Sequence, residues 1–191
     1  MNRLIIGICS VLILSSSGWP GPMPDPAKSA LQGCSDVSKI DFRNSTIPLQ
    51  DGGSFTLVDG KGCASDGLPG KCDWEQTLEL DRVLNPEPGT ILRLIVVNSN
   101  HKTGSGAWDY VLVFACRAGQ LQKVLHNRYL YGAALDPIGD KTLKIKSGHW
   151  LETDPMCCPS VEKFESFEWD KAAETFKLSG IEYVPQHDAG R

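Results

Sequence analysis

The feature that most constrains this chain is a strand-like pattern from about Cys34 onward, made of short runs in which apolar and polar side chains alternate or apolar side chains dominate. No window of twelve or more residues shows the 3.6-residue period of a helix; short helices are expected only near Cys34–Lys39 and Leu130–Leu135. Ile91–Val97 and Tyr110–Cys116 are almost continuously apolar, which is typical of central strands covered on both faces. We therefore predict a mainly β fold, possibly α+β, with one antiparallel sheet built of hairpins.

Further strands are expected where short runs lie between turn signals. Alternation in the first long run places Trp74, Leu78 and Leu80 on one face, with acidic residues on the other. In the run Phe164–Trp169 the aromatic residues do not follow the two-residue period of a strand. This predicts either a bulge or an aromatic residue on each face. The predicted strands are Ser54–Val58, Trp74–Asp81, Leu121–Leu125, Thr142–Lys146, Phe164–Trp169 and Thr175–Leu178.

The first 18 residues have the layout of a signal peptide. Arg3 precedes an apolar run from Leu4 to Leu14, and small polar residues follow up to Gly18. The run is shorter than the about 20 residues that span a bilayer, so no membrane span is expected after cleavage. The alternative is a buried amino-terminal strand. We predict a proline-rich and glycine-rich linker at 19–33, a single domain at 34–184 and a flexible tail at 185–191.

The cysteine count supports export independently. Of seven cysteines, Cys9 would leave with the signal peptide, and an even number in an exported chain predicts a disulfide framework. This places the protein in an oxidising compartment, either secreted or periplasmic. The six cysteines that remain are Cys34, Cys63, Cys72, Cys116, Cys157 and Cys158.

The spacing of these cysteines predicts part of their pairing. Cys63 and Cys72 flank a short turn-rich loop, so they are the first predicted pair. Adjacent Cys157 and Cys158 are expected to reach two distant partners, which leaves Cys34 and Cys116, in an order that the sequence leaves open.

Charge and motifs exclude several classes of function. Removing residues 1–18 takes away one arginine and no acid, so 18 basic residues face 23 acidic ones, a net charge of −5. Without a basic stripe, nucleic acid is not an expected partner.

The four histidines lack metal-ligand spacing, and the Asp-Gly pairs are interpreted as turns, with calcium as the alternative. We expect no metal, no cofactor and no catalytic residue; Gly104-Ser105-Gly106 is interpreted as a hairpin connection.

Trp108, Asp109 and Tyr110 are the candidate binding residues, because a Trp and a Tyr beside a glycine loop can stack on a sugar or anchor a protein. Packing in the core is the alternative for them. The predicted function is a non-enzymatic binding or envelope-associated domain that recognises a protein or a glycan through loops. One form of it is an inhibitor of a secreted enzyme, which would also use the loop 64–71. A purely structural envelope component is a further alternative.

A different alternative is a small secreted hydrolase that uses paired carboxylates. Its candidate residues are Asp81, Asp109, Glu152 and Asp154. Two of these acids would have to face each other about 5–9 Å apart in a cleft.

One segment resembles a known group. Asp154-Pro155-Met156-Cys157-Cys158-Pro159-Ser160, followed by Trp169-Asp170, is similar to a motif of uncharacterised exported bacterial proteins of the LppP/LprE lipoprotein type. Weaker similarities are found at Asp41–Thr46 and at Gly104–Val111, so the resemblance covers about 36–180. The resemblance implies an exported β domain. It implies no reaction, because none is established for that group.

The chain also departs from that group. Cys9 follows bulky Ile8, which does not fit a lipidation site, and Cys63, Cys72 and Cys116 are additional cysteines. Lipid anchoring is therefore not expected of this chain, and the mature protein is predicted to be soluble.

Overall fold

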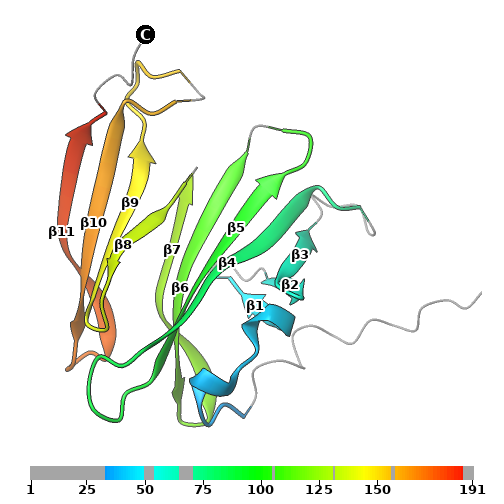
Figure 1. Ribbon diagram of the computed structural model, residues 1–191, viewed down its shortest axis with the longest axis vertical. Helices are drawn as coiled ribbons and strands as arrows, with labels where there is room; N and C mark the ends of the chain where they lie inside the picture. The colour runs from blue at the N-terminus through cyan, green and yellow to red at the C-terminus, as the bar shows by residue number, and fades with distance from the viewer. Residues whose placement is uncertain are drawn as a thin grey trace, which may run out of the picture.

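The computed structural model describes residues 33–49, 54–64, 71–104, 106–130, 132–155 and 158–186. The predicted signal peptide, and all but the last residue of the predicted linker, lie outside these residues. The first of two antiparallel sheets is curled and has seven strands in chain order (Figure 1). They are β1 (Thr46–Pro48), β2 (Ser54–Val58), β3 (Lys61–Ala64), β4 (Trp74–Leu84), β5 (Leu92–His101), β6 (Ala107–Arg117) and β7 (Gln120–Leu130).

The second sheet has four strands, in the order β11-β10-β9-β8. They are β8 (Ala134–Ile138), β9 (Thr142–His149), β10 (Val161–Asp170) and β11 (Thr175–Pro185). Within the described residues the only helical elements are two 3-10 turns, η1 (Val37–Lys39) and η2 (Phe42–Asn44). The predicted mainly β, antiparallel fold is thus confirmed, although the strands form two sheets instead of one.

Most predicted strands are present, several of them longer than expected. The helix expected at Leu130–Leu135 is wrong: β7 extends to Leu130, and β8 begins at Ala134. Near Cys34–Lys39 only the single 3-10 turn η1 forms. The last strand extends to Pro185, and the backbone amide of Gln186 donates to the carbonyl of Ser160, so the sheet includes residues that were expected to belong to the tail.

The seven-stranded sheet is covered on both of its faces. One face packs against the second sheet through a core that includes Leu94, Val113, Ile145 and Phe167. On the other face, the curl of the sheet brings its own first strands, β1 and β2, together with the amino-terminal 3-10 turns, against β5 and β6. The largest fully buried side chains of this core are Phe42, Ile47, Leu57, Ile95, Leu112 and Phe114. Strands β5 and β6 therefore contribute alternate side chains to two separate cores, as their continuous apolar runs predict.

A bulge in β4 changes the predicted facing of its side chains. Leu78 pairs with Val97 and Leu80 pairs with the adjacent Val96, so Glu79 is an extra residue in β4. Leu78 consequently enters the amino-terminal core, whereas Leu80 packs against the core between the sheets. The prediction that Trp74, Leu78 and Leu80 share one face is wrong for Leu80, because the bulge reverses the alternation after Leu78.

The aromatic residues of β10 lie on both faces of the second sheet. Phe167 and Trp169 pack in the core between the sheets. Phe164 lies on the opposite face, with the Lys144 ammonium 4.7 Å from its ring centroid. The associated bulge falls in the partner strand: Ser166 pairs with Gly180 and Phe167 with Leu178.

Two disulfides connect described residues. Cys63 and Cys72 are bonded, as their short loop predicts, with their Cα atoms 5.4 Å apart. Cys34 is bonded to Cys116, also with a Cα–Cα distance of 5.4 Å. The backbone amides of Gly33 and Cys34 both donate to the carbonyl of Gly119, which holds this segment against the β6–β7 turn and brings the two cysteines together.

The expectation that Cys157 and Cys158 pair with Cys34 and Cys116 is therefore wrong. Cys158 is itself disulfide-bonded, whereas Cys157 lies outside the described residues. The disulfides indicate an oxidising, extracytoplasmic location. In the described part of the chain, no helix is long and apolar enough to cross a membrane.

Candidate binding pocket

The alternation of β6 separates the three candidate binding residues. Trp108 and Tyr110 point to the face of the seven-stranded sheet that carries the amino-terminal core, and both are half-buried. Asp109 lies between them on the opposite face and is 5% exposed. Two of the three residues therefore share a site, and the third belongs to the interior.

Trp108 and Tyr110 line a pocket of about 260 Å³ where the amino-terminal core opens to solvent. Trp74 of β4 lines it as well, and Phe55 of β2 forms part of its wall, with its ring centroid 5.8 Å from that of Tyr110. The aromatic side chains thus come from three strands that the curl of the sheet brings around one hollow. Leu49, Ser54 and Ala64 complete the wall on the side of β1 to β3.

The polar part of the lining is formed by Gln76 and Ser99. Gln76 is 3% exposed and Ser99 is 5% exposed, and the Gln76 Nε2 lies 3.4 Å from the Ser99 Oγ. The Gln76 Oε1 is buried and has no hydrogen-bond partner among the described residues. If the Gln76 amide is turned so that its oxygen faces Ser99, its nitrogen is left without a partner instead. A buried amide with a free end costs about 1–3 kcal/mol unless a ligand or water completes it.

Arg128 of β7 supplies the charge of the pocket. Its side chain is exposed, and its guanidinium carbon lies 4.2 Å from the centroid of the Trp108 ring. The described residues that line the pocket include no acidic side chain. A guanidinium stacked on an aromatic face keeps its N–H groups directed outward in its own plane, where they can meet an anion.

The β5–β6 hairpin positions Trp74 from the side. The Trp74 ring centroid lies 4.8 Å from that of His101, edge to face. A Cβ on Gly106 would lie 3.0 Å from the Trp74 Cη2, so the absence of a side chain at Gly106 allows the ring to lie there. Gly104 and Gly106 thus lie in a hairpin connection, as predicted, and Gly106 makes room for a pocket residue.

This close approach predicts the effect of Gly106→Ala. The added methyl group should displace the Trp74 ring by a few tenths of an ångström and destabilise the fold by about 1 kcal/mol. The indole N–H resonance of Trp74 in a ¹H–¹⁵N spectrum should move. Gly180→Ala is the matched control, because nothing lies within 4 Å of a Cβ at that position. An unchanged Trp74 resonance in Gly106→Ala would contradict the contact.

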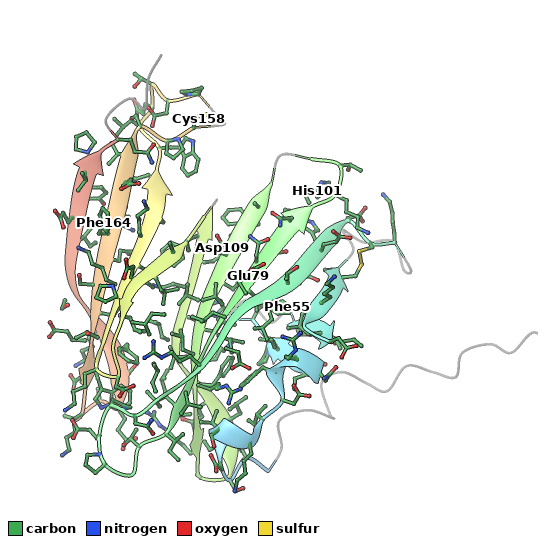
Figure 2. All side chains as sticks on the ribbon, in the orientation of Figure 1. Phe55, Glu79, His101, Asp109, Cys158 and Phe164 are labelled. Carbon is green, nitrogen blue, oxygen red and sulfur yellow. A yellow bond between two sulfur atoms is a disulfide. The ribbon has the colours of Figure 1, made fainter. Side chains whose placement is uncertain are left out.

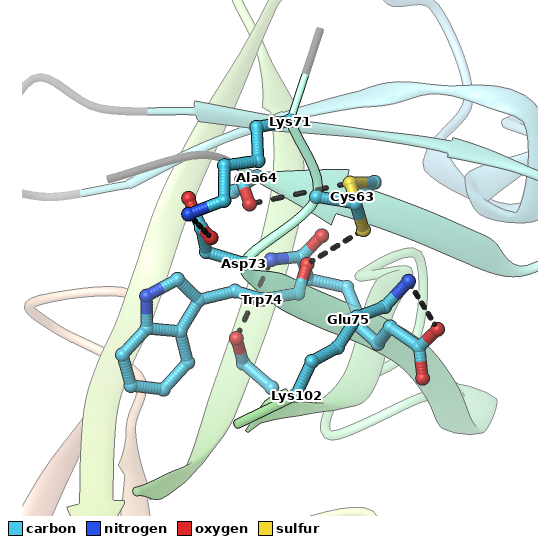
Figure 3. The surroundings of a disulfide bond; sticks show 10 residues. Cys63, Ala64, Lys71, Asp73, Trp74, Glu75 and Lys102 are labelled. Atoms are coloured by element: carbon cyan, nitrogen blue, oxygen red, sulfur yellow. Dashed lines mark hydrogen bonds and ion pairs between the residues drawn. A yellow bond between two sulfur atoms is a disulfide. The ribbon is translucent and has the colours of Figure 1, made fainter. Parts of the chain in front are cut away.

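The disulfide Cys63–Cys72 holds the neighbouring end of β3 against β4. Ala64 pairs with Trp74, and the backbone amide of Asp73 donates to the carbonyl of Ala64. Figure 3 shows the Trp74 indole pointing away from the disulfide, so the bond supports the backbone of the pocket wall and does not contact the ring. Residues 65–70 of the loop predicted to bind an enzyme lie outside the described residues.

Asp109 has a structural role on the opposite face. Its Oδ1 accepts a hydrogen bond of 2.8 Å from the Asn98 Nδ2, and its Oδ2 accepts one of 2.6 Å from the backbone amide of Ala133. Asp109 lies on the same face of β6 as Val111 and Val113, which belong to the core between the two sheets. The carboxylate ties the seven-stranded sheet to the segment that leads into the second sheet.

The other candidate carboxylates are also separated from the pocket, and none of them lines it. Asp81 is paired with Arg93, and this hydrogen bond raises the pKa of Arg93. Glu152 is exposed. Asp154 accepts hydrogen bonds from the backbone amides of Leu151 and Ser160, which lower the pKa of its carboxyl group. The structure thus gives Asp81 and Asp154 separate structural partners.

The motif that carries the resemblance closes on itself through Asp154. Its carboxylate accepts a hydrogen bond of 2.9 Å from the backbone amide of Ser160, so Asp154 and Ser160 lie close together in the connection between β9 and β10 (Figure 2, near Cys158). Because the pKa of Asp154 is lowered, its carboxylate is ionised and keeps these hydrogen bonds at every pH above the ordinary aspartate range. The hydrogen bonds are lost as the pH falls through the lowered pKa.

No group of three or more His, Cys, Asp or Glu side chains in the described residues could hold a metal ion. Comparison with protein-family models, with curated proteins and with solved structures found no match.

Most pocket residues escaped the sequence analysis, and Gln76 and Arg128 are the two that matter most for its chemistry. Gln76 is two residues from both Trp74 and Leu78, so the alternation places all three side chains on the same, buried face of the strand. A buried face is an uncommon position for a polar residue. Arg128 lies beyond the predicted end of its strand at Leu125, and no sequence signal places it over Trp108.

Proposed function

We propose that this chain is an exported, non-enzymatic binding domain that recognises a saccharide in the aromatic pocket. The observation that carries the proposal is the buried Gln76 amide, one end of which has no partner among the described residues, inside a hollow walled by Trp74, Trp108 and Tyr110. Sugar rings have an apolar C–H face and a rim of hydroxyl groups. The first suits an aromatic wall, and the second suits an amide beside a hydroxyl.

The arrangement favours a sugar over a purely apolar ligand. An apolar molecule in the pocket would leave the buried Gln76 atom unpaired and displace any water that reaches it, at a cost of about 1–3 kcal/mol. A sugar hydroxyl can donate to the amide oxygen or accept from the amide nitrogen, so it satisfies either orientation of the side chain.

The positions of the carboxylates favour binding over hydrolysis. A glycosidase of the usual kind needs two carboxyl groups about 5–9 Å apart beside the bound sugar. The four candidate acids lie outside the pocket lining, and Asp109 is used in the interior. Export fits this role, and we further propose that the protein is secreted or periplasmic and related to the LppP/LprE lipoprotein type.

An oligosaccharide array carrying neutral and acidic members tests the proposal. The wild type should bind a subset of the sugars, and Trp108→Ala should lower the affinity about tenfold or more, because it removes an aromatic wall and the support of Arg128. Tyr183→Ala is the control, since it removes an exposed aromatic side chain from β11 of the second sheet. The proposal fails if no member of the array binds, or if the two variants bind alike.

A further inference from the structure

We infer that the sugar recognised by the pocket is acidic, with its carboxylate held by Arg128. The inference rests on the proposed function and adds a chemical class to it. Its starting point is the charge of the pocket: among the described residues that line it, Arg128 is the only one with a charged side chain, whereas the protein as a whole carries a formal net charge of −4.

Arg128 has no carboxylate partner among the described residues, in contrast to three other cations of the same sheet. Arg93 is paired with Asp81, Arg117 with Glu174 and Lys102 with Glu75. No ion pair of the described residues includes Arg128, which lies against the Trp108 ring instead. Its N–H groups are therefore available to a ligand.

Stacking on Trp108 also prepares the guanidinium for a planar anion. Arginine binds a carboxylate through two parallel N–H donors that lie in the guanidinium plane, and the aromatic ring occupies one face of that plane without blocking its edge. The ring restricts the motion of a long side chain before the ligand arrives, so less conformational entropy is lost on binding.

The three kinds of group in the pocket match three parts of one acidic sugar. The aromatic walls fit the C–H face of the ring, the buried pair Gln76 and Ser99 fits hydroxyl groups, and Arg128 fits a carboxylate at the solvent edge. The volume of about 260 Å³ lies just below the about 300–1,000 Å³ of sites that enclose a drug-sized ligand. The pocket therefore takes one sugar ring, as a terminal residue or as a free sugar acid.

Matched pairs of sugars test this assignment by calorimetric titration of the intact protein. D-glucuronate is compared with D-glucose and D-galacturonate with D-galactose, because each pair differs only in the carboxylate. In at least one pair the acid should bind about tenfold more tightly than the neutral sugar, and added salt should reduce this preference.

Two variants locate the source of the preference. Arg128→Gln should abolish the tenfold preference while it retains the weak affinity for the neutral sugar. Lys171→Gln, which removes a positive charge from an exposed side chain at the β10–β11 turn, should leave the preference intact.

The outcomes separate the two proposals. Equal affinity for acid and neutral sugar in both pairs would overturn the inference and leave saccharide binding in place. Retention of the preference in Arg128→Gln would overturn the role of Arg128. Absence of binding to these sugars and to every member of the oligosaccharide array would overturn the proposed function itself, and the inference with it.

Discussion

Asp109→Ala is expected to lower the free energy of unfolding by about 3 kcal/mol, because it removes a buried acceptor from two donors at once. The Asn98 amide and the backbone N–H of Ala133 both bond this carboxylate, which is 5% exposed. Denaturation with urea, followed by circular dichroism, measures the loss.

The neighbouring residue on the same strand provides the comparison. Trp108→Ala should weaken saccharide binding and cost less stability than Asp109→Ala, since Trp108 is half-buried at the pocket. Folded Asp109→Ala protein should bind the saccharide with unchanged affinity. If Asp109→Ala instead proved as stable as the wild type and bound the sugar tenfold more weakly, Asp109 would belong to the binding site.

Removing the Cys34–Cys116 disulfide should destabilise the protein more than removing Cys63–Cys72. The first bond joins residues 82 positions apart and the second joins residues 9 positions apart. The loop-entropy model gives about 4.5 kcal/mol for the long loop and about 2.5 kcal/mol for the short one.

The two double variants to alanine, Cys34→Ala/Cys116→Ala and Cys63→Ala/Cys72→Ala, allow the comparison by urea denaturation. Cys34 is also a buried member of the amino-terminal core, which adds to the loss in the first variant. Equal losses, or a larger loss for the short loop, would contradict the account in which the Cys34–Cys116 bond fixes the amino-terminal segment beside the β6–β7 turn.

Local patterns predicted the strands because each alternation reports burial on one face. They could not predict the bulge at Glu79, since an inserted residue has no signature of its own and is recognised only from its pairing with β5. The division into two sheets also depends on long-range contacts. For the same reason the pairing of Cys34 with Cys116 was missed: it follows from backbone hydrogen bonds between Gly119 and residues that are remote in sequence.

The pocket was predictable only in part. Trp108 and Tyr110 stood out as aromatic residues beside a glycine loop, but treating them as a unit with Asp109 overlooked the two-residue period of a strand. Gln76 was visible as a polar residue on an apolar face. The position of Arg128 over Trp108 depends on the register of β6 and β7, where Arg128 is opposite Tyr110, and no local pattern specifies that register.

The central claim is that ligand binds on the pocket face of the seven-stranded sheet, and tryptophan indole resonances test it most directly. In a ¹H–¹⁵N titration with the acidic sugar that binds most tightly, the indole signals of Trp74 and Trp108 should shift in proportion to occupancy. The signal of Trp169, whose ring packs between the two sheets against Phe176, should stay in place. Shifts confined to Trp169, or saturation of binding without movement of Trp74 and Trp108, would contradict the account.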